Sequence, residues 1–188
     1  MQHNPSSDLK SWRSLLSVIA AMFALSIAVV PVLAQEGRPA SNALPNIVLV
    51  HGAWADGSSW SGVIQRLQMV GYNVTAVQLP LTSLDEDVAT VRGVLAAQTG
   101  PTILVAHSYG GAVITQLGTD APNVIGLVYI AAFAPDAGET MKALTSAGPQ
   151  PAGSAAIRPD QRGFLWLDPS GFVQFFAPDV DPVQAKVL

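Results

Sequence analysis

Four short apolar runs recur along the middle of the chain, at residues 47–50, 72–77, 102–105 and 124–131. The first of them, at 47–50, is aliphatic and β-branched and lacks the alternation of apolar and polar residues that marks a strand with one wet face. Continuous apolar runs of this kind are typical of strands buried on both faces of a parallel sheet. We therefore predict four strands at these positions.

The segments between the runs have helical spacing. One apolar face comprises Trp60, Val63, Ile64 and Leu67, and another comprises Leu84, Val88, Val91 and Leu95. A third helix is predicted over 112–117, directly after the third strand. Strands that alternate with helices predict an α/β fold, a doubly wound and mostly parallel sheet with helices on both faces.

Polar residues and glycine mark where these helices begin and end. Ser58 or Ser59 is expected to cap the first helix, and Gly71 is expected to end it. Ser83 and Glu86 form a capping box at the start of the second. The three acids at 85–87 then lie in the first turn, where the helix dipole favours negative charge, so we interpret them as helix-start residues and not as catalytic carboxylates.

The two ends of the chain differ from this core, which we place at 46–135. Lys10 and Arg13 precede an uncharged run over 14–34, and the pattern around Ala34 suits signal peptidase, so we predict a signal peptide over 1–34 and a linker over 35–45. The alternative is an uncleaved anchor helix at 14–34. Either reading predicts export, to the periplasm or outside the cell, and cleavage would leave no stable membrane association. Prolines and aromatic clusters over 136–188 predict the start of a lid.

Composition excludes several classes of function. The formal net charge is -4 and no basic cluster is present, which argues against nucleic-acid binding. The absence of cysteine excludes disulfides, thiol catalysis and cysteine metal sites. The three histidines are scattered, and neither a metal-ligand cluster nor a cofactor motif is evident, so we expect no cofactor.

The segment from Ala106 to Gly111, AHSYGG, carries the candidate chemistry. It joins a predicted buried strand to a predicted helix, and a small-x-Ser-x-Gly pattern in that context is a nucleophile elbow. The elbow places Ser108 at the tip of a sharp turn. Ala106 and Gly110 provide the small residues that the close approach of strand and helix requires. Ser108 is therefore the candidate nucleophile.

A serine nucleophile also needs donors for an oxyanion and a base. We assign the donors to the backbone N–H groups of Tyr109 and Ala53, with Gly52 allowing the turn of the loop after the first strand. His51 is expected to brace that loop, and the ring of His107 is expected to point away from the serine. Neither is assigned as the base. Trp54 and the aromatic residues of the lid suggest either an apolar pocket or simple packing.

Three segments, LVHGAWADGSSW, VAHSYGG and VYIAAFAPDAGE, resemble bacterial esterase-like α/β-hydrolases related to plant methylsalicylate esterases and hydroxynitrile lyases. The resemblance covers 47–141 well and the lid loosely. It implies a triad in the order serine, acid, histidine, with the last two members after the lid. No histidine follows Ser108, so the resemblance implies an N-terminal fragment of the fold, truncated after its fourth recognisable strand. Asp136 is either an early triad acid or a turn residue.

The resemblance implies a serine hydrolase that acts on a small-molecule ester, inactive as this chain because the triad histidine is absent. Two alternatives are a hydroxynitrile-lyase-like lyase and a non-catalytic ligand-binding protein that keeps the pocket. Truncation would make the apolar run 124–131 an edge strand, and an apolar edge promotes aggregation. We therefore expect the chain to be poorly soluble or unstable alone.

Overall fold

The structure is a computed structural model that describes residues 44–118 and 120–188. The predicted signal peptide, its alternative as an anchor helix, and nearly all of the predicted linker lie outside the described residues. The described residues belong to one compact unit. Within that unit, no helix has the length and apolar character needed to cross a bilayer.

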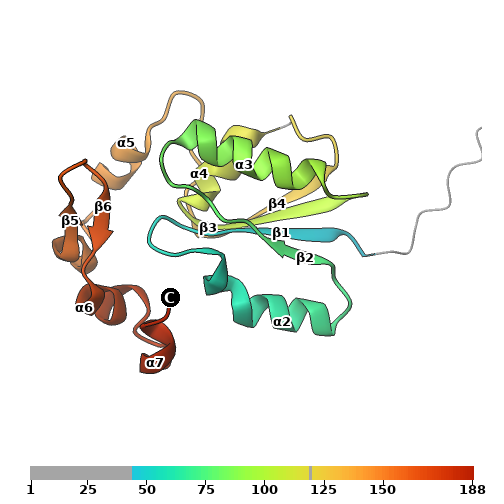
Figure 1. The fold of residues 1–188 in the computed structure, drawn as a ribbon. Coiled ribbons are helices and arrows are strands. Elements are labelled where there is room, and N and C mark those ends of the chain that lie inside the picture. The colour runs from blue at the N-terminus through green and yellow to red at the C-terminus, as the bar shows by residue number, and fades with distance from the viewer. Residues whose placement is uncertain (1–43, 119) are drawn as a thin grey trace, which may run out of the picture. The chain divides into compact units, whose positions relative to one another are not determined.

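A four-stranded parallel sheet forms the centre of this unit (Figure 1). Its strands are β1 (Asn46–Val50), β2 (Val74–Ala76), β3 (Thr102–Ser108) and β4 (Val124–Ala132), arranged in the order β2-β1-β3-β4. All neighbouring pairs are parallel. The predicted fold class is confirmed, although β2 is shorter than the apolar run that predicted it.

Residues 47–50 of β1 alternate between two apolar layers, which explains why this part of the strand is entirely apolar. Ile47 and Leu49 pack in a cluster with Trp60 and with helix α2 (Ser61–Met69), on one face of the sheet. Val48 and Val50 pack in a second cluster on the opposite face. Both faces of this strand are therefore covered, as the sequence predicts.

Helices α3 (Leu84–Ala96) and α4 (Gly110–Leu117) cover that second face (Figure 1). Their buried contributions include Val88 and Val91 from α3 and Val113 from α4. The predicted capping box at the start of α3 is half confirmed. The Ser83 hydroxyl accepts the N–H of Glu86 at 3.2 Å, as a capping box requires. The Glu86 carboxylate instead accepts the hydroxyl of Thr82.

The predicted serine cap of the first helix is wrong. A 3-10 helix, η1 (Gly57–Trp60), precedes α2, and its N-cap is Asp56. The Asp56 carboxylate accepts the N–H of Ser58 at 2.7 Å, and hydrogen bonds from Ser58 hold its pKa below the ordinary value. The predicted helix end is confirmed: Gly71 has φ of +93°, and its N–H reaches the carbonyl of Gln68 at 3.0 Å.

Residues 136–188 add no strand to the central sheet. They form the short elements α5 (Met141–Ser146), η2 (Ala152–Ala156), β5 (Ile157–Pro159), β6 (Leu165–Leu167), α6 (Pro169–Gly171), η3 (Phe172–Phe176) and α7 (Pro182–Ala185). β5 and β6 make a separate antiparallel pair. Phe172, Ala177 and Ala185 are the buried centre of a small apolar cluster, and Trp54 of the core packs against it.

Strand β4 lies at one edge of the described sheet. Ile125 is 64% exposed and Val128 is 43% exposed, so much of its apolar surface is open. This is the arrangement that favours pairing with another chain. The expected poor solubility stays a prediction.

Candidate active site

Ser108 stands at the carboxyl end of β3, where the chain turns into α4. Its φ is +52°, a left-handed backbone conformation that residues with a side chain seldom adopt. Tyr109 is the N-cap residue, and the helix begins at Gly110. Such backbone strain concentrates at functional sites. The local geometry is that of a strand-turn-helix elbow with the serine at its tip.

Small residues are required on both sides of this serine. A Cβ on Gly110 would lie 2.7 Å from the carbonyl oxygens of both Val50 and His51, so a larger residue would push α4 away from β1. Ala106 is fully buried in the core beneath the turn. Strand and helix approach as closely as the small-x-Ser-x-Gly pattern requires.

The loop after β1 passes directly beside Ser108. A Cβ on Gly52 would lie 2.9 Å from the Cβ of Ser108 and 3.3 Å from Nδ1 of His107. Glycine is therefore needed for the loop to approach the serine. The next residue in that loop is Ala53. Neither the Ala53 N–H nor the Tyr109 N–H donates a hydrogen bond to any other described residue.

His51 is buried, and both of its ring nitrogens are engaged. Nε2 accepts the N–H of Leu79 at 3.0 Å, so Nδ1 carries the proton and donates to the carbonyl of Gly52 at 2.8 Å. These bonds tie the loop after β1 to the loop after β2. Because neither nitrogen is free, His51 is not placed to take a proton from Ser108.

His107 is packed between aromatic rings. Its ring meets Trp60 edge-on, with centroids 6.5 Å apart, and Phe176 of η3 at 6.1 Å. Burial lowers the pKa of His107 below its ordinary value of 6.5. Its side chain thus links the core to the small apolar cluster around Phe172.

The lowered pKa of His107 predicts a loss of stability in acid. In the unfolded chain this imidazole takes up a proton near pH 6.5, whereas the folded chain resists that proton to a lower pH. Stability is therefore full above that value and falls as the pH drops below it. We expect the melting temperature of the wild type to fall more than that of His107→Gln when the pH is lowered from about 7.5 to about 5.5. Equal falls in the melting temperatures of the wild type and His107→Gln, measured by calorimetry, would contradict this assignment.

Asp87 is a site residue that the sequence interpretation missed. It is fully buried, although it was expected to be an ordinary acid of the first helical turn. Its Oδ2 accepts the hydroxyl of Tyr109 at 2.6 Å, and its Oδ1 accepts the N–H of Leu81 at 2.9 Å. Burial, followed by this hydrogen bond, raises the pKa of the Tyr109 phenol well above its ordinary value. Its position in the sequence could have predicted this burial, because Asp87 lies four residues before Val91 and therefore on the same buried face of α3.

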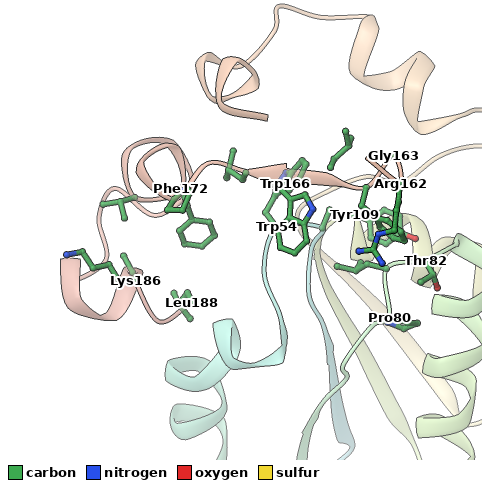
Figure 2. Close-up of a pocket in the computed structure, with 18 of the residues that line it drawn as sticks. Trp54, Pro80, Thr82, Tyr109, Arg162, Gly163, Trp166, Phe172, Lys186 and Leu188 are labelled. Atoms are coloured by element: carbon green, nitrogen blue, oxygen red, sulfur yellow. The ribbon is translucent and has the colours of Figure 1, made fainter. Parts of the chain in front are cut away.

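A cavity of about 1120 Å³ opens beside the elbow, where Tyr109 lines it and Ser108 itself does not. Both candidate oxyanion residues, Ala53 and Tyr109, contribute to its wall. Trp54 and Trp166 project toward its middle, with Tyr109 and Arg162 at one end and Phe172 at the other (Figure 2). The remaining lining residues are Pro80, Leu81, Thr82, Ser83, Gly163, Phe164, Leu165, Leu167, Pro169, Val173, Ala185, Lys186 and Leu188.

Asp136, the other predicted candidate for the triad, is placed away from this cavity. Asp136 is exposed in a turn, where its carboxylate accepts the N–H of Ala137 at 2.8 Å and its carbonyl accepts the N–H of Glu139 at 3.0 Å. It does not line the cavity. Among the residues that the structure describes, no cluster of histidine and acidic side chains could hold a metal ion.

A parallel sheet with helices on both faces, and a strained serine at the strand-to-helix turn beside the β1 loop, define an α/β-hydrolase fold. The chain matches the model of the alpha/beta hydrolase family over residues 47–187 and belongs to that family.

Its relatives by sequence include bacterial and plant hydrolases. The chain is 35% identical to the carbendazim hydrolyzing esterase of Nocardioides sp. (strain SG-4G), over 54% of this chain and 47% of that protein. It is 32% identical to the pyrethroid hydrolase of Sphingobium wenxiniae, over 46% of this chain and 35% of that one. It is also 35% identical to methylesterase 7 of Arabidopsis thaliana, over 47% of this chain and 38% of that protein. The chain thus spans half or less of each of these relatives.

Solved structures agree with these matches. A pyrethroid hydrolase from Sphingobium faniae JZ-2 superposes with a TM-score of 0.65 and 28% identity, over 73% of this chain and 62% of that one. Tomato methylketone synthase I gives a TM-score of 0.63 over 76% of this chain and 64% of that one. At 19% identity, the second likeness shows a shared fold alone.

Proposed function

We propose that this chain carries the nucleophile and the oxyanion hole of a serine-dependent carboxylic-ester hydrolase. The observation that carries the proposal is the left-handed backbone of Ser108, with φ of +52°. The nearby N–H groups of Ala53 and Tyr109 donate no hydrogen bond to any described residue, so both are available to an oxyanion. Both of these residues also line the cavity. The relatives named as esterases and hydrolases support the same reaction.

The chemistry follows from this arrangement. The Ser108 oxygen attacks the ester carbonyl carbon while its proton passes to a base, and the carbonyl oxygen becomes an oxyanion. The N–H groups of Ala53 and Tyr109 stabilise that charge. Collapse of the tetrahedral intermediate expels the alcohol and leaves an acyl-serine, which water then hydrolyses.

The cavity indicates what kind of ester fits. Aromatic and aliphatic side chains, including Trp54, Trp166 and Phe172, form most of its wall. A carbonyl group held at the Ala53 end would leave the rest of the molecule against these apolar surfaces. We therefore propose a small apolar ester as the substrate.

The engaged histidines favour a second candidate, a protein that binds such a ligand without turning it over. His51 uses both ring nitrogens in hydrogen bonds, and His107 is packed between Trp60 and Phe176. Neither supplies a base to Ser108. We accordingly expect the 188-residue chain alone to hydrolyse esters no faster than its Ser108→Ala variant.

Chemical rescue separates the two candidates. Added imidazole can replace a missing general base, so it should raise hydrolysis of p-nitrophenyl acetate by the wild-type chain by about tenfold over the same chain without imidazole. The gain is measured after subtraction of the reaction of imidazole with the ester in buffer.

Two variants serve as controls for this rescue. Ser108→Ala should abolish the gain. Ser59→Ala removes an exposed hydroxyl from η1 and should preserve it. A rescue that survives Ser108→Ala, or no rescue in a chain with a native melting transition, would overturn the ester-hydrolase proposal and favour the binding protein.

A further inference from the structure

We propose that Asp87 is a positioning residue that sets the shape of the cavity wall beside the elbow, by fixing the elbow residue Tyr109 and the loop after β2 to one another. The inference rests on the proposed function of Ser108. Asp87 does not line the cavity and touches no reacting atom, so it acts through the two groups that it holds.

The contacts of Asp87 are few and specific. Its side chain is fully buried, and each carboxylate oxygen accepts one hydrogen bond. Oδ2 receives the phenol of Tyr109 at 2.6 Å, and Oδ1 receives the N–H of Leu81 at 2.9 Å. Buried charge is costly unless it is well hydrogen-bonded, and bonds to a carboxylate are short and strong. Both partners are therefore held firmly.

Each partner contributes to the cavity wall. Tyr109 lines the cavity, and its backbone N–H is a proposed oxyanion donor. Leu81 lies in the loop 79–83, of which Pro80, Leu81, Thr82 and Ser83 also line the cavity. Asp87 thus connects two walls that come from different strand ends.

The backbone of the loop needs this support. Leu81 has φ of +56°, a left-handed conformation that costs energy for a residue with a side chain. The loop is tied to the β1 loop at its other end, because Nε2 of His51 accepts the N–H of Leu79 and the Gln78 side chain accepts the N–H of Gly57 at 3.1 Å. The bond from Leu81 to Asp87 adds the tie to the elbow.

A carboxylate suits this position better than an amide. Both of its oxygens accept, which matches two donors. In Asp87→Asn one of these atoms becomes an NH₂ group, which faces either the Leu81 N–H or the Tyr109 hydroxyl. Retaining the Leu81 bond would then force the phenol to reverse its role. Asp87→Asn therefore preserves the shape of the side chain and disturbs the hydrogen bonds that join Leu81 to Tyr109.

The test compares three variants of the 188-residue chain. Asp87→Asn and Tyr109→Phe break the link from its two sides. Asp85→Asn removes the same charge from the same helical turn, but at an exposed side chain. Rates of Ser108 modification are measured by intact mass with added imidazole, using two fluorophosphonates that carry a methyl or an octyl chain.

We expect the octyl-to-methyl rate ratio to fall by about fivefold in both Asp87→Asn and Tyr109→Phe and to keep its value in Asp85→Asn. Ultraviolet titration supplies a readout that does not depend on Ser108. The Tyr109 phenol, identified by difference from Tyr109→Phe, should begin to ionise at a lower pH in Asp87→Asn, because a neighbouring negative charge has gone.

Two outcomes would overturn the inference. One is a folded Asp87→Asn or Tyr109→Phe chain that keeps the wild-type rate ratio, which would make Asp87 merely structural. The other is an equal fall in Asp85→Asn, which would make the effect one of charge alone. Should one of the two link variants fail to fold, the other decides. Failure of the proposed function is distinguishable, because Ser108 would then resist both probes while the tyrosine titration still shifted.

Discussion

Replacing Gly111 with alanine should lower the free energy of unfolding by about 3 kcal/mol or more, at the upper end of the range for overpacking. The added Cβ would overlap the carbonyl oxygen of Phe133 and lie 2.8 Å from the Cβ of Ala132. The first obstacle is backbone, so it cannot rotate away. Relief would require α4 to move off β4, and the elbow would move with it. Urea unfolding monitored by circular dichroism measures the loss.

Gly93 offers a matched control. It lies inside α3, and a Cβ there would meet nothing within 4 Å. Because alanine favours a helix over glycine, Gly93→Ala should stabilise the chain by about 0.5–1 kcal/mol. The same chemical change should therefore have opposite signs at positions 111 and 93. Comparable stability of the two variants would contradict the close approach of α4 to β4.

The second large effect concerns His51. We expect His51→Ala to lower the free energy of unfolding by about 3 kcal/mol, because the change leaves the buried N–H of Leu79 without an acceptor and opens a cavity. The wild-type side chain is 1% exposed and bonds to both Leu79 and Gly52. Thermal and urea unfolding provide the measurement.

Volume and hydrogen bonding can be separated at this position. His51→Phe fills the space of the imidazole without an acceptor, so it should remain destabilised relative to the wild type. A His51→Phe chain as stable as the wild type would show that packing alone explains the burial of His51, and that the bond to Leu79 contributes nothing.

The strands could be predicted because their chemistry is local. A strand covered on both faces needs an apolar residue at every position, and β1 shows this directly, with Ile47 and Leu49 on one face and Val48 and Val50 on the other. The elbow could also be predicted from the sequence, since small residues must flank a nucleophile at a strand-to-helix turn. Gly110 occupies that place, against the carbonyls of Val50 and His51.

The sequence did not predict the roles of polar groups whose hydrogen-bond partners depend on tertiary structure. Asp56 displaced Ser58 and Ser59 as the helix cap because the chain enters through a 3-10 turn that the sequence pattern does not reveal. Asp87 looked like any acid of a first helical turn. Its burial depends on Tyr109, which lies 22 residues further along the chain, and on the backbone N–H of Leu81, which the turn before α3 brings back to it.

The role of Ser108 as a nucleophile held in an oxyanion hole is tested by locating its covalent adduct. The chain is treated with a fluorophosphonate in the presence of imidazole, and the modified peptide is identified by mass spectrometry. We predict one phosphonyl group per chain, attached to Ser108 and absent from Ser108→Ala. Modification spread over the exposed serines Ser58 and Ser59, or a folded chain without any adduct, would contradict the claim.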